Sequence, residues 1–223
     1  RATLLYNDFN VSDDFEALAA ALLSAHAPVD ALGIQSHMHK GTWPLDRAWE
    51  VCAAYARFGV PLHFTELTVL SGAPKAADDN DWHAVRPDWP STAAGEAAQL
   101  AYASALYTLL FSHPAVEAIT WWDFSDRRSW QGAPSGLLRR DMSPKPLYEW
   151  LVDAFGRRWR TSVAGTADGD GRMAFRGFFG DYEVRVAAPW GDPLWGAFHL
   201  GRRDVRRLEV TLSPRPAPGG LRP

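Results

Sequence analysis

The segment VPLHFTEL, residues 60–67, is an apolar run that carries a carboxylate, Glu66, close to its end. An ionised side chain at the end of a buried run costs free energy unless neighbouring groups bind it. The pattern predicts a buried strand over residues 60–64 with Glu66 at its end. What Glu66 does therefore depends on the fold in which this strand lies.

Three further apolar runs resemble this one, at residues 4–6, 31–34 and 116–122. Each of the four runs is followed by a segment with apolar residues at helical spacing. Helices are expected between Ser12 and Pro28, over 45–56, over 100–110 and over 147–154. Strands that are apolar throughout and alternate with amphipathic helices are typical of a parallel sheet. The sequence therefore predicts an α/β fold with four βα units.

Every predicted strand ends in polar or aromatic residues. In α/β folds, and above all in (β/α)₈ barrels, the carboxyl ends of the strands are where catalytic groups lie. These ends carry Asn7-Asp8, Gln35 to His37, Thr65-Glu66 and Trp121 to Asp123. A catalytic role for Glu66 becomes plausible for this reason.

The character of the sequence changes after Gly156, where glycine-rich turns separate short alternating segments. Strands are expected at 173–175, 182–186 and 208–212, which predicts a small antiparallel β domain. The domain boundaries expected are 1–156 for the α/β part, 157–212 for the β domain and 213–223 for a Pro/Gly-rich, mobile tail.

Composition excludes several classes of protein. The chain of 223 residues is 47% hydrophobic and 22% charged, which is typical of globular domains, and its formal charge of −3 argues against nucleic acid as a partner. No apolar stretch is long enough to span a membrane, and no signal peptide is visible. The single cysteine, Cys52, excludes an internal disulfide and a cysteine-based zinc site. Because the chain does not start with Met, the true N-terminus is expected upstream.

Two short motifs resemble metal-binding sequences, but neither has a complete set of ligands. Asp168-Gly-Asp170-Gly resembles the start of a calcium loop, but Arg172 stands where the third oxygen ligand belongs, so a tight turn is the better interpretation. The pair His37 and His39 lacks an evident third ligand. We expect no metal and no cofactor.

Taken together, five segments resemble glycoside hydrolase family 10, the endo-1,4-β-xylanases with a (β/α)₈ barrel. They are LLYNDFN at 4–10, LGIQSHMH at 32–39, HFTEL at 63–67, ITWWDFSDRRSW at 119–130 and GLLRRDMSPKPLYEWL at 136–151. The likeness runs over residues 1–156 in the order of the family's last four strand regions. It implies the second half of a (β/α)₈ TIM barrel, retaining hydrolysis of xylan, and an extracellular or secreted protein.

The resemblance also implies roles for particular residues. Glu66 corresponds to the catalytic nucleophile, and Gln35 and His37 correspond to hydrogen-bond partners that orient it. An imidazole that donates to a carboxylate favours its charged form. Substrate contacts are implied for His37 and for four further residues: Asn7, Gln35, Trp122 and Trp130.

Three departures from the family pattern matter. Thr68 stands where the family has an acid, so any contact that orients the histidine must be weaker or come from elsewhere. Phe9 replaces a tyrosine. The general acid/base of the family lies in the barrel half that precedes this chain, and no substitute is found, because the remaining glutamates are expected in helices or at strand beginnings: Glu16, Glu50, Glu96, Glu117 and Glu149. The chain is thus expected to be a fragment that needs the missing N-terminal half as a partner. Alone, it is expected to be inactive and to aggregate, dimerise or fold poorly.

Other interpretations stay open. The protein could be a different retaining (β/α)₈ glycosidase, acting on β-glucans or galactosides, or a non-catalytic carbohydrate-binding scaffold. Trp43, Trp82 and Trp89 could be sugar platforms or loop packing. For the remaining polar and aromatic residues structural roles are favoured: His39 and His63 in packing, Asp123 and Asp126 in loop hydrogen bonds, Trp150 and Trp159 in packing.

Overall fold

The computed structural model describes residues 2–187, 191–201 and 207–214. The chain divides into two compact units, Arg1–Asp153 and Ala154–Pro223. Of the helices that lie in these ranges, none combines the length and the apolar character that a membrane span requires.

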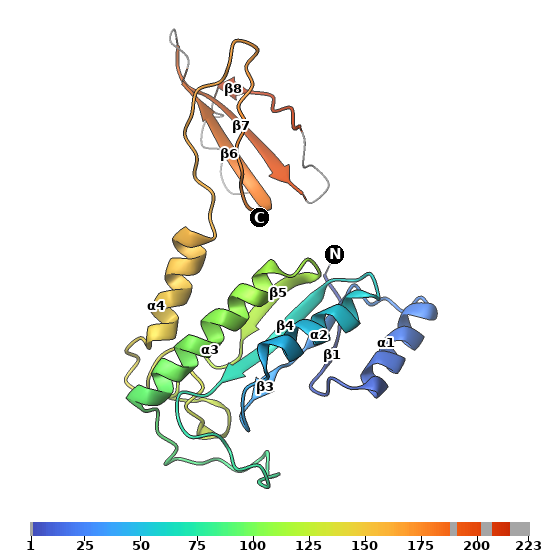
Figure 1. The fold of residues 1–223 in the computed structure, drawn as a ribbon, viewed down its shortest axis with the longest axis vertical. Coiled ribbons are helices and arrows are strands. Elements are labelled where there is room, and N and C mark those ends of the chain that lie inside the picture. The colour runs from blue at the N-terminus through green and yellow to red at the C-terminus, as the bar shows by residue number, and fades with distance from the viewer. Residues whose placement is uncertain (1, 188–190, 202–206, 215–223) are drawn as a thin grey trace. The chain divides into compact units, whose positions relative to one another are not determined.

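The first unit is built on a parallel sheet (Figure 1). Its strands are β1 (Leu5–Asp8), β2 (Ala31–Ile34), β3 (His37–Met38), β4 (Leu62–Val69) and β5 (Val116–Trp121). β4 pairs with β5 on one side; on the other it pairs with β2 along its first half and with β3 along its second half. β2 and β3 therefore act as one strand that is interrupted at residues 35–36, and β1 lies beyond β2.

Helices connect the strands, and α2 and α3 lie over one face of the sheet (Figure 1). The helices are α1 (Asp13–Ser24), α2 (Leu45–Ala56), α3 (Ala93–Ser112) and α4 (Pro146–Asp153). The Ser12 hydroxyl accepts from Phe15 N–H at the start of α1, and the Thr92 hydroxyl accepts from Gly95 N–H at the start of α3. Such caps satisfy backbone donors that have no partner within the helix. The predicted α/β class with four βα units is confirmed.

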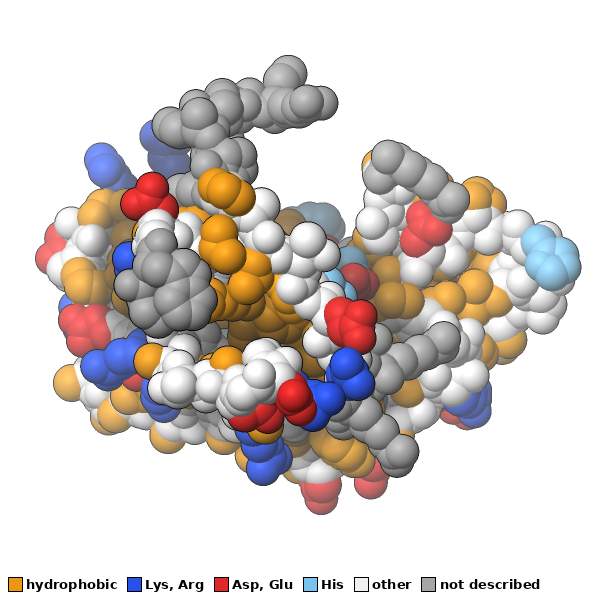
Figure 2. All heavy atoms as spheres, turned by 90° about the horizontal axis from the view of Figure 1, so that it is seen from above, with side chains coloured by type: hydrophobic (Ala, Val, Ile, Leu, Met, Phe, Trp, Pro, Cys, Tyr) orange, Lys and Arg blue, Asp and Glu red, His pale blue; other side chains and the backbone are white. Residues whose placement is uncertain are grey.

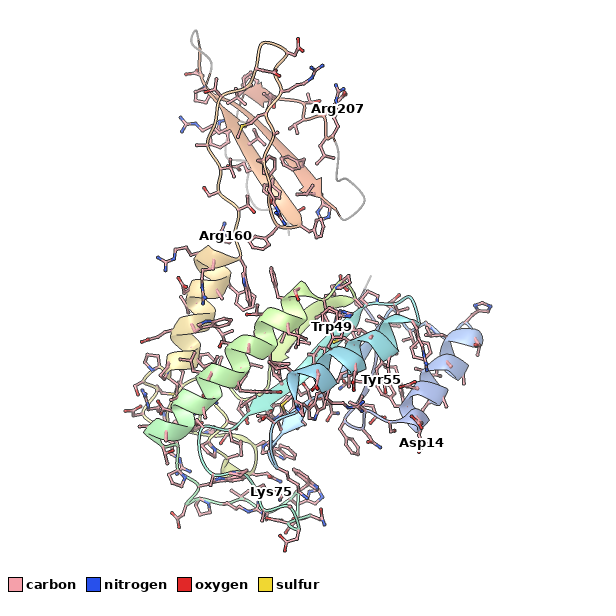
Figure 3. The ribbon with its side chains drawn as sticks, in the orientation of Figure 1. Asp14, Trp49, Tyr55, Lys75, Arg160 and Arg207 are labelled. Atoms are coloured by element: carbon pink, nitrogen blue, oxygen red, sulfur yellow. The ribbon has the colours of Figure 1, made fainter. Side chains whose placement is uncertain are left out.

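The core of this unit lies between the helices and the sheet. Leu32, Ile34, Leu62 and Phe64 are fully buried on β2 and β4. Tyr55 of α2 is also fully buried; its ring lies 4.9 Å from that of Phe15 and its hydroxyl donates to Ser12 O at 3.3 Å (Figure 3). The continuous burial of β2 is what the apolar run at 31–34 predicts.

The expectation that Glu66 ends its strand is wrong, because β4 continues to Val69. Phe64 pairs with Ile119 and Leu67 with Trp121, so β4 holds one more residue than β5 over this interval. An extra residue of this kind is a β-bulge, which bends the strand and redirects side chains. Glu66 thus lies inside a strand, at a bulge that the apolar pattern of 60–67 does not reveal.

The loop between β5 and α4 is fixed by buried polar contacts. The Lys145 ammonium, fully buried, lies 2.8 Å from Asp126 and donates to the Ser71 hydroxyl at 2.8 Å. Asp126 also accepts from Gly136 N–H at 2.7 Å. Because a buried charge is stable only when paired and hydrogen-bonded, this cluster ties the loop to the end of β4. The structural role expected of Asp126 is confirmed.

The second unit contains an antiparallel sheet of β6 (Gly180–Val186), β7 (Leu194–Leu200) and β8 (Ser213–Pro214). Its position relative to the first unit is not defined. The strand expected at 182–186 lies in β6, whereas 173–175 and 208–212 form no strand. Phe175 contributes its ring instead, 5.6 Å from Tyr182. The third strand, β8, begins where the tail was expected, and residues 215–223 of that tail lie outside the described residues.

The motif at 168–171 forms a turn. The Asp168 carboxylate accepts from Asp170 N–H at 3.0 Å and from Arg172 N–H at 2.8 Å. Gly171 has φ of +74°, a conformation that glycine adopts without strain. The tight turn favoured by the sequence is confirmed.

Candidate active site

Glu66 and His37 meet because of the register between β3 and β4. His37 pairs with Thr68, and Glu66 lies two residues before Thr68, so their side chains share one face of the sheet. The His37 Nε2 atom lies 2.9 Å from Glu66 Oε2. The other ring nitrogen, Nδ1, lies 3.0 Å from the Thr68 hydroxyl. Ser36, with φ of +60°, makes the break between β2 and β3 that precedes His37.

The second oxygen of Glu66 is bound from β1. The Asn7 amide donates to Glu66 Oε1 at 3.1 Å, and the Thr65 hydroxyl donates to Asn7 Oδ1 at 2.7 Å. Asn7 reaches across β2 at Gly33, its register partner. A Cβ atom at Gly33 would lie 2.5 Å from Asn7 Oδ1, so the glycine is what leaves room for this contact.

Burial and charge set the protonation of this group. The side chains of His37 and Glu66 are 14% and 16% exposed. Burial lowers the pKa of His37 below its usual 6.5, although the hydrogen bond to Glu66 and the charges of Glu66 and Asp123 oppose this. The imidazole is therefore neutral at neutral pH.

Two indoles stand beside the carboxylate. The Trp122 ring is edge-on to the His37 ring at 5.5 Å and 46% of Trp122 is exposed. The Trp130 ring lies 5.0 Å from His37. Indole faces of this kind can stack on the apolar C–H face of a pyranose. The site thus combines a polar cluster around Glu66 with an aromatic wall, which is formed by the indoles of Trp122 and Trp130.

Asp123 fixes the backbone of Trp130, one of the two tryptophans in this wall. Its carboxylate accepts from Trp130 N–H at 3.0 Å and from the Ser135 hydroxyl at 2.5 Å. Burial raises the pKa of Asp123, while these two hydrogen bonds oppose the rise. The loop-holding role expected of Asp123 is confirmed.

The three tryptophans left open by the sequence differ from one another. Trp89 is 9% exposed and donates to Ala73 O, so it packs the loop. Trp43 is half-buried, and its carbonyl accepts from Tyr102.

Trp82 is 36% exposed, and its ring stacks on that of Trp130 with the ring centroids 5.9 Å apart and an interplanar angle of 12°. Lys75, in the loop beyond the carboxyl end of β4 (Figure 3), places its ammonium 4.6 Å from the Trp82 ring. Trp82 therefore extends the aromatic wall away from Glu66.

Not every residue expected at the site joins this group. Among the described residues, no hydrogen bond links the Gln35 side chain to Glu66; Gln35 N–H donates to Asp8 O and continues the pairing of β1 with β2. Phe9 is 73% exposed. At Thr68 the sequence predicted a histidine contact that is weaker or comes from elsewhere. The contact comes from the Thr68 hydroxyl, 3.0 Å from His37 Nδ1, and a neutral hydroxyl binds less strongly than a carboxylate. Thr65 is the residue that sequence reasoning missed as a partner of Asn7. Thr68 was noted only as a departure, and its spacing of two residues from Glu66 was the signal that both lie on one face of the strand.

The remaining candidates lie elsewhere. His39 is 1% exposed, and neither ring nitrogen has a hydrogen-bond partner among the described residues. Burial lowers its pKa to about 4, so it packs as a neutral ring, as expected. Within the described ranges, no three His, Cys, Asp or Glu side chains are grouped to hold a metal. The other glutamates considered lie in helices or at a strand beginning, as expected: Glu16, Glu50, Glu96, Glu117 and Glu149.

The curated proteins similar in sequence to this chain include xylanases. Endo-1,4-beta-xylanase B of Cellvibrio japonicus is 26% identical over 156 residues, covering 68% of this chain and 22% of that protein. Endo-1,4-beta-xylanase 1 of Arabidopsis thaliana is 27% identical over 230 residues, covering 93% of this chain and 20% of that protein. The anti-sigma-I factor RsgI6 of Acetivibrio thermocellus is 35% identical, but over only 91 residues, which are 38% of this chain and 11% of that protein.

Solved structures give the same fold. A thermostable mutant of xylanase Xyn10A from Cellvibrio japonicus superposes with a TM-score of 0.55 at 25% identity, over 69% of this chain and 49% of that one. Xylanase 10B of Thermotoga petrophila, solved with xylobiose, gives 0.56 at 21% identity, over 70% and 47%. The chain thus spans about half the length of these solved xylanases, and the prediction of half a (β/α)₈ barrel is confirmed.

The model of one protein family, glycosyl hydrolase family 10, matches residues 1–154. That range holds the whole parallel sheet and every residue of the Glu66 cluster described above. The segments that suggested this resemblance in the sequence lie inside it. On fold, site and sequence together, the chain belongs to glycosyl hydrolase family 10.

Proposed function

We propose that this chain carries the nucleophile side of the active site of a retaining endo-1,4-β-xylanase. One observation supports this most: the Glu66 carboxylate is held by an amide at 3.1 Å and an imidazole at 2.9 Å, beside exposed indole. The two donors fix both oxygens of the carboxylate. An ionised carboxylate is the form that can attack.

The chemistry is a double displacement. One oxygen of Glu66 attacks the anomeric carbon, the bond from that carbon to the leaving sugar oxygen breaks, and a general acid protonates that oxygen. Water then attacks the same carbon, gives a proton to the same group acting as a base, and releases Glu66. His37 and Asn7 orient the nucleophile throughout, and Trp122 and Trp130 pack against the sugar ring.

A second carboxyl group about 5 Å from Glu66 is required by this mechanism. The Glu96 and Glu117 carboxylates instead pair with Arg139 and His63, away from Glu66. We therefore propose that four preceding βα units of the complete protein supply the acid/base and close the barrel. The isolated chain is expected to be inactive.

Xylan is the substrate that the names of the relatives support, since four of them are xylanases or a celloxylanase. Because xylan is a polymer too large to cross a membrane, we expect the enzyme to act outside the cell. Gln35, half-buried beside the site, is proposed as a substrate contact rather than as a partner of Glu66.

The test uses the complete protein that contains this chain, with Glu66→Gln as the variant. Glutamine keeps the shape of the side chain and the contact with Asn7 but cannot act as a nucleophile. Hydrolysis of xylan is expected to fall at least about a thousandfold, while binding in xylan affinity electrophoresis is retained. Proton NMR of the products of the native enzyme should show the β-anomer first.

Glu117→Gln is the matched control, because Glu117 is an exposed glutamate at the start of β5. It should hydrolyse xylan at the native rate. Full activity of Glu66→Gln would overturn the role of Glu66. A native protein that binds xylan without cutting it would favour the carbohydrate-binding scaffold, and faster cleavage of β-glucan or galactan would favour another glycosidase.

A further inference from the structure

Thr68 contacts the site in a way that the reaction scheme does not use. Its hydroxyl oxygen lies 3.0 Å from His37 Nδ1 and 3.1 Å from the backbone carbonyl of Glu66. Thr68 is fully buried, and it faces His37 as its register partner across β3 and β4. The hydroxyl therefore stands between the imidazole and the backbone of the nucleophile.

A hydroxyl has one proton to donate and lone pairs that accept. When His37 is neutral with its proton on Nε2, the hydroxyl can rotate and donate to Nδ1. When His37 is protonated, the hydroxyl can accept from Nδ1–H and donate to the Glu66 carbonyl. The single hydroxyl proton therefore goes to Nδ1 of the neutral ring, or to the Glu66 carbonyl when the ring is protonated.

We propose that Thr68 is a positioning residue, whose hydroxyl donates to His37 Nδ1 and so selects, for the neutral imidazole, the tautomer with Nε2–H directed at Glu66. This rests on the proposed function and deepens it. A neutral donor stabilises the carboxylate less than an imidazolium cation does, so the nucleophile keeps more of its reactivity. A carboxylate at position 68 could only accept, and would favour the imidazolium.

Other charged groups around His37 act on the same equilibrium. Burial opposes protonation of the ring, while Glu66 on β4 and Asp123 after β5 favour it. Both carboxylates are unchanged in variants of Thr68. A difference between such variants therefore reports the hydroxyl itself.

The experiment is ¹⁵N NMR of histidine-labelled complete protein, titrated with acid, for the native enzyme and for Thr68→Val, Thr68→Ser and Thr68→Asp. The ring-nitrogen shifts show which nitrogen carries the proton. The native enzyme and Thr68→Ser should show Nε2 protonated and Nδ1 bare at neutral pH. The pKa of His37 should fall in Thr68→Val, where Nδ1–H of the cation has no acceptor, and rise in Thr68→Asp.

Kinetics give a second readout. Thr68→Val should lower kcat for xylan about tenfold with little change in KM, and Thr68→Ser should restore kcat to within about twofold. Thr68→Asp should lower kcat at neutral pH. As the pH is lowered, kcat of this variant should begin to fall at a higher pH than kcat of the native enzyme.

An unchanged His37 pKa in both Thr68→Val and Thr68→Asp, or a native ring protonated on Nδ1, would overturn the proposal. Should Thr68→Val fail to fold, the Ser and Asp variants decide the outcome by the same titration. An enzyme inactive on xylan would contradict the proposed function alone, because the titration of His37 does not depend on hydrolysis.

Discussion

At the scale of single residues, His39 couples the aromatic wall to pH. It is almost fully buried, its ring lies against those of Trp82 and Trp130, and burial lowers its pKa to about 4. An unfolded histidine titrates near 6.5. Between these two values the unfolded chain binds a proton that the folded chain does not, so stability is complete above pH 6.5 and falls as the pH drops towards 4.

We therefore predict that the protonation of His39 in the unfolded chain lowers the stability of the protein as the pH falls. At about 1.4 kcal/mol per pKa unit, the free energy of unfolding should fall by roughly 3 kcal/mol from this residue between pH 7 and pH 4. His39→Leu keeps a similar volume and should remove that part of the slope. Urea unfolding of the complete protein, followed by tryptophan fluorescence at several pH values, measures the difference.

His83→Gln serves as the control, because His83 is exposed in the same loop region. It should leave the slope unchanged. If the His39→Leu slope equals that of the native protein, the folded form accommodates a charged ring at position 39 and the prediction is wrong.

Residue-scale features were only partly predictable from the sequence. The resemblance pointed to Glu66 and His37, and the structure brings them within 2.9 Å. It singled out Thr68 as a departure that bears on the histidine contact, but that the Thr68 hydroxyl itself makes this contact depends on the parallel register of β3 with β4. Gln35 was expected at the carboxylate, but it lies at the interruption between β2 and β3, where alternation of side chains no longer holds.

At the scale of elements, the spacing of β1 and β4 across β2 decides how Glu66 is bound. Asn7 on β1 contacts Glu66 on β4 although β2 lies between them, and Gly33 is the β2 residue over which it passes. The atoms that a Cβ at Gly33 would meet first all belong to Asn7. The amide is a flexible side chain, so it would move before the strands did.

Gly33→Ala should therefore act on Asn7 rather than on the sheet. We expect the amide to leave Glu66 Oε1 and kcat on xylan to fall by about tenfold, as one hydrogen bond to a charged group is lost. Thermal unfolding should change little. Asn7→Ala should cause a similar loss, and the double variant should be no slower than either single one, since both remove the same contact.

Gly41→Ala is a useful comparison, because a Cβ at Gly41 meets no atom within 4 Å, although its φ of +142° adds backbone strain. Activity should be retained there. Additive losses in the Gly33→Ala and Asn7→Ala double variant would show that Gly33 affects the site by another route.

The presence of strands and helices was more predictable from the sequence than their exact ends and pairing. Apolar runs and helical spacing located four strands and four helices of the first unit, because burial imposes both periods. The extension of β4 to Val69 was not predictable, since a bulge is set by pairing with β5. In the second unit, no described residue from 160 to 214 is buried, so the alternation of apolar and polar residues predicts strands less well there. Two of the three strands expected in this unit were wrong.

At the scale of the whole molecule, the parallel sheet has two open edges. Among the described strands, β1 pairs with β2 alone and β5 with β4 alone. Leu4 is 46% exposed and Leu5 37% exposed at the β1 edge. Hydrophobic side chains lie among charged ones on the surface (Figure 2). Open edges of this kind offer backbone donors and acceptors to another chain.

We therefore predict that the 223-residue chain associates with itself when prepared alone, and that a segment carrying the four preceding βα units suppresses this. Light scattering after size-exclusion chromatography should give a mass that rises with concentration for the chain alone and a one-to-one complex for the mixture. Hydrogen exchange should show the amides of β1 and β5 protected only in the complex, because pairing at both edges is what closes a barrel. A chain that remains monomeric at every concentration, with the same protection in both samples, would mean that these edges are covered by other means.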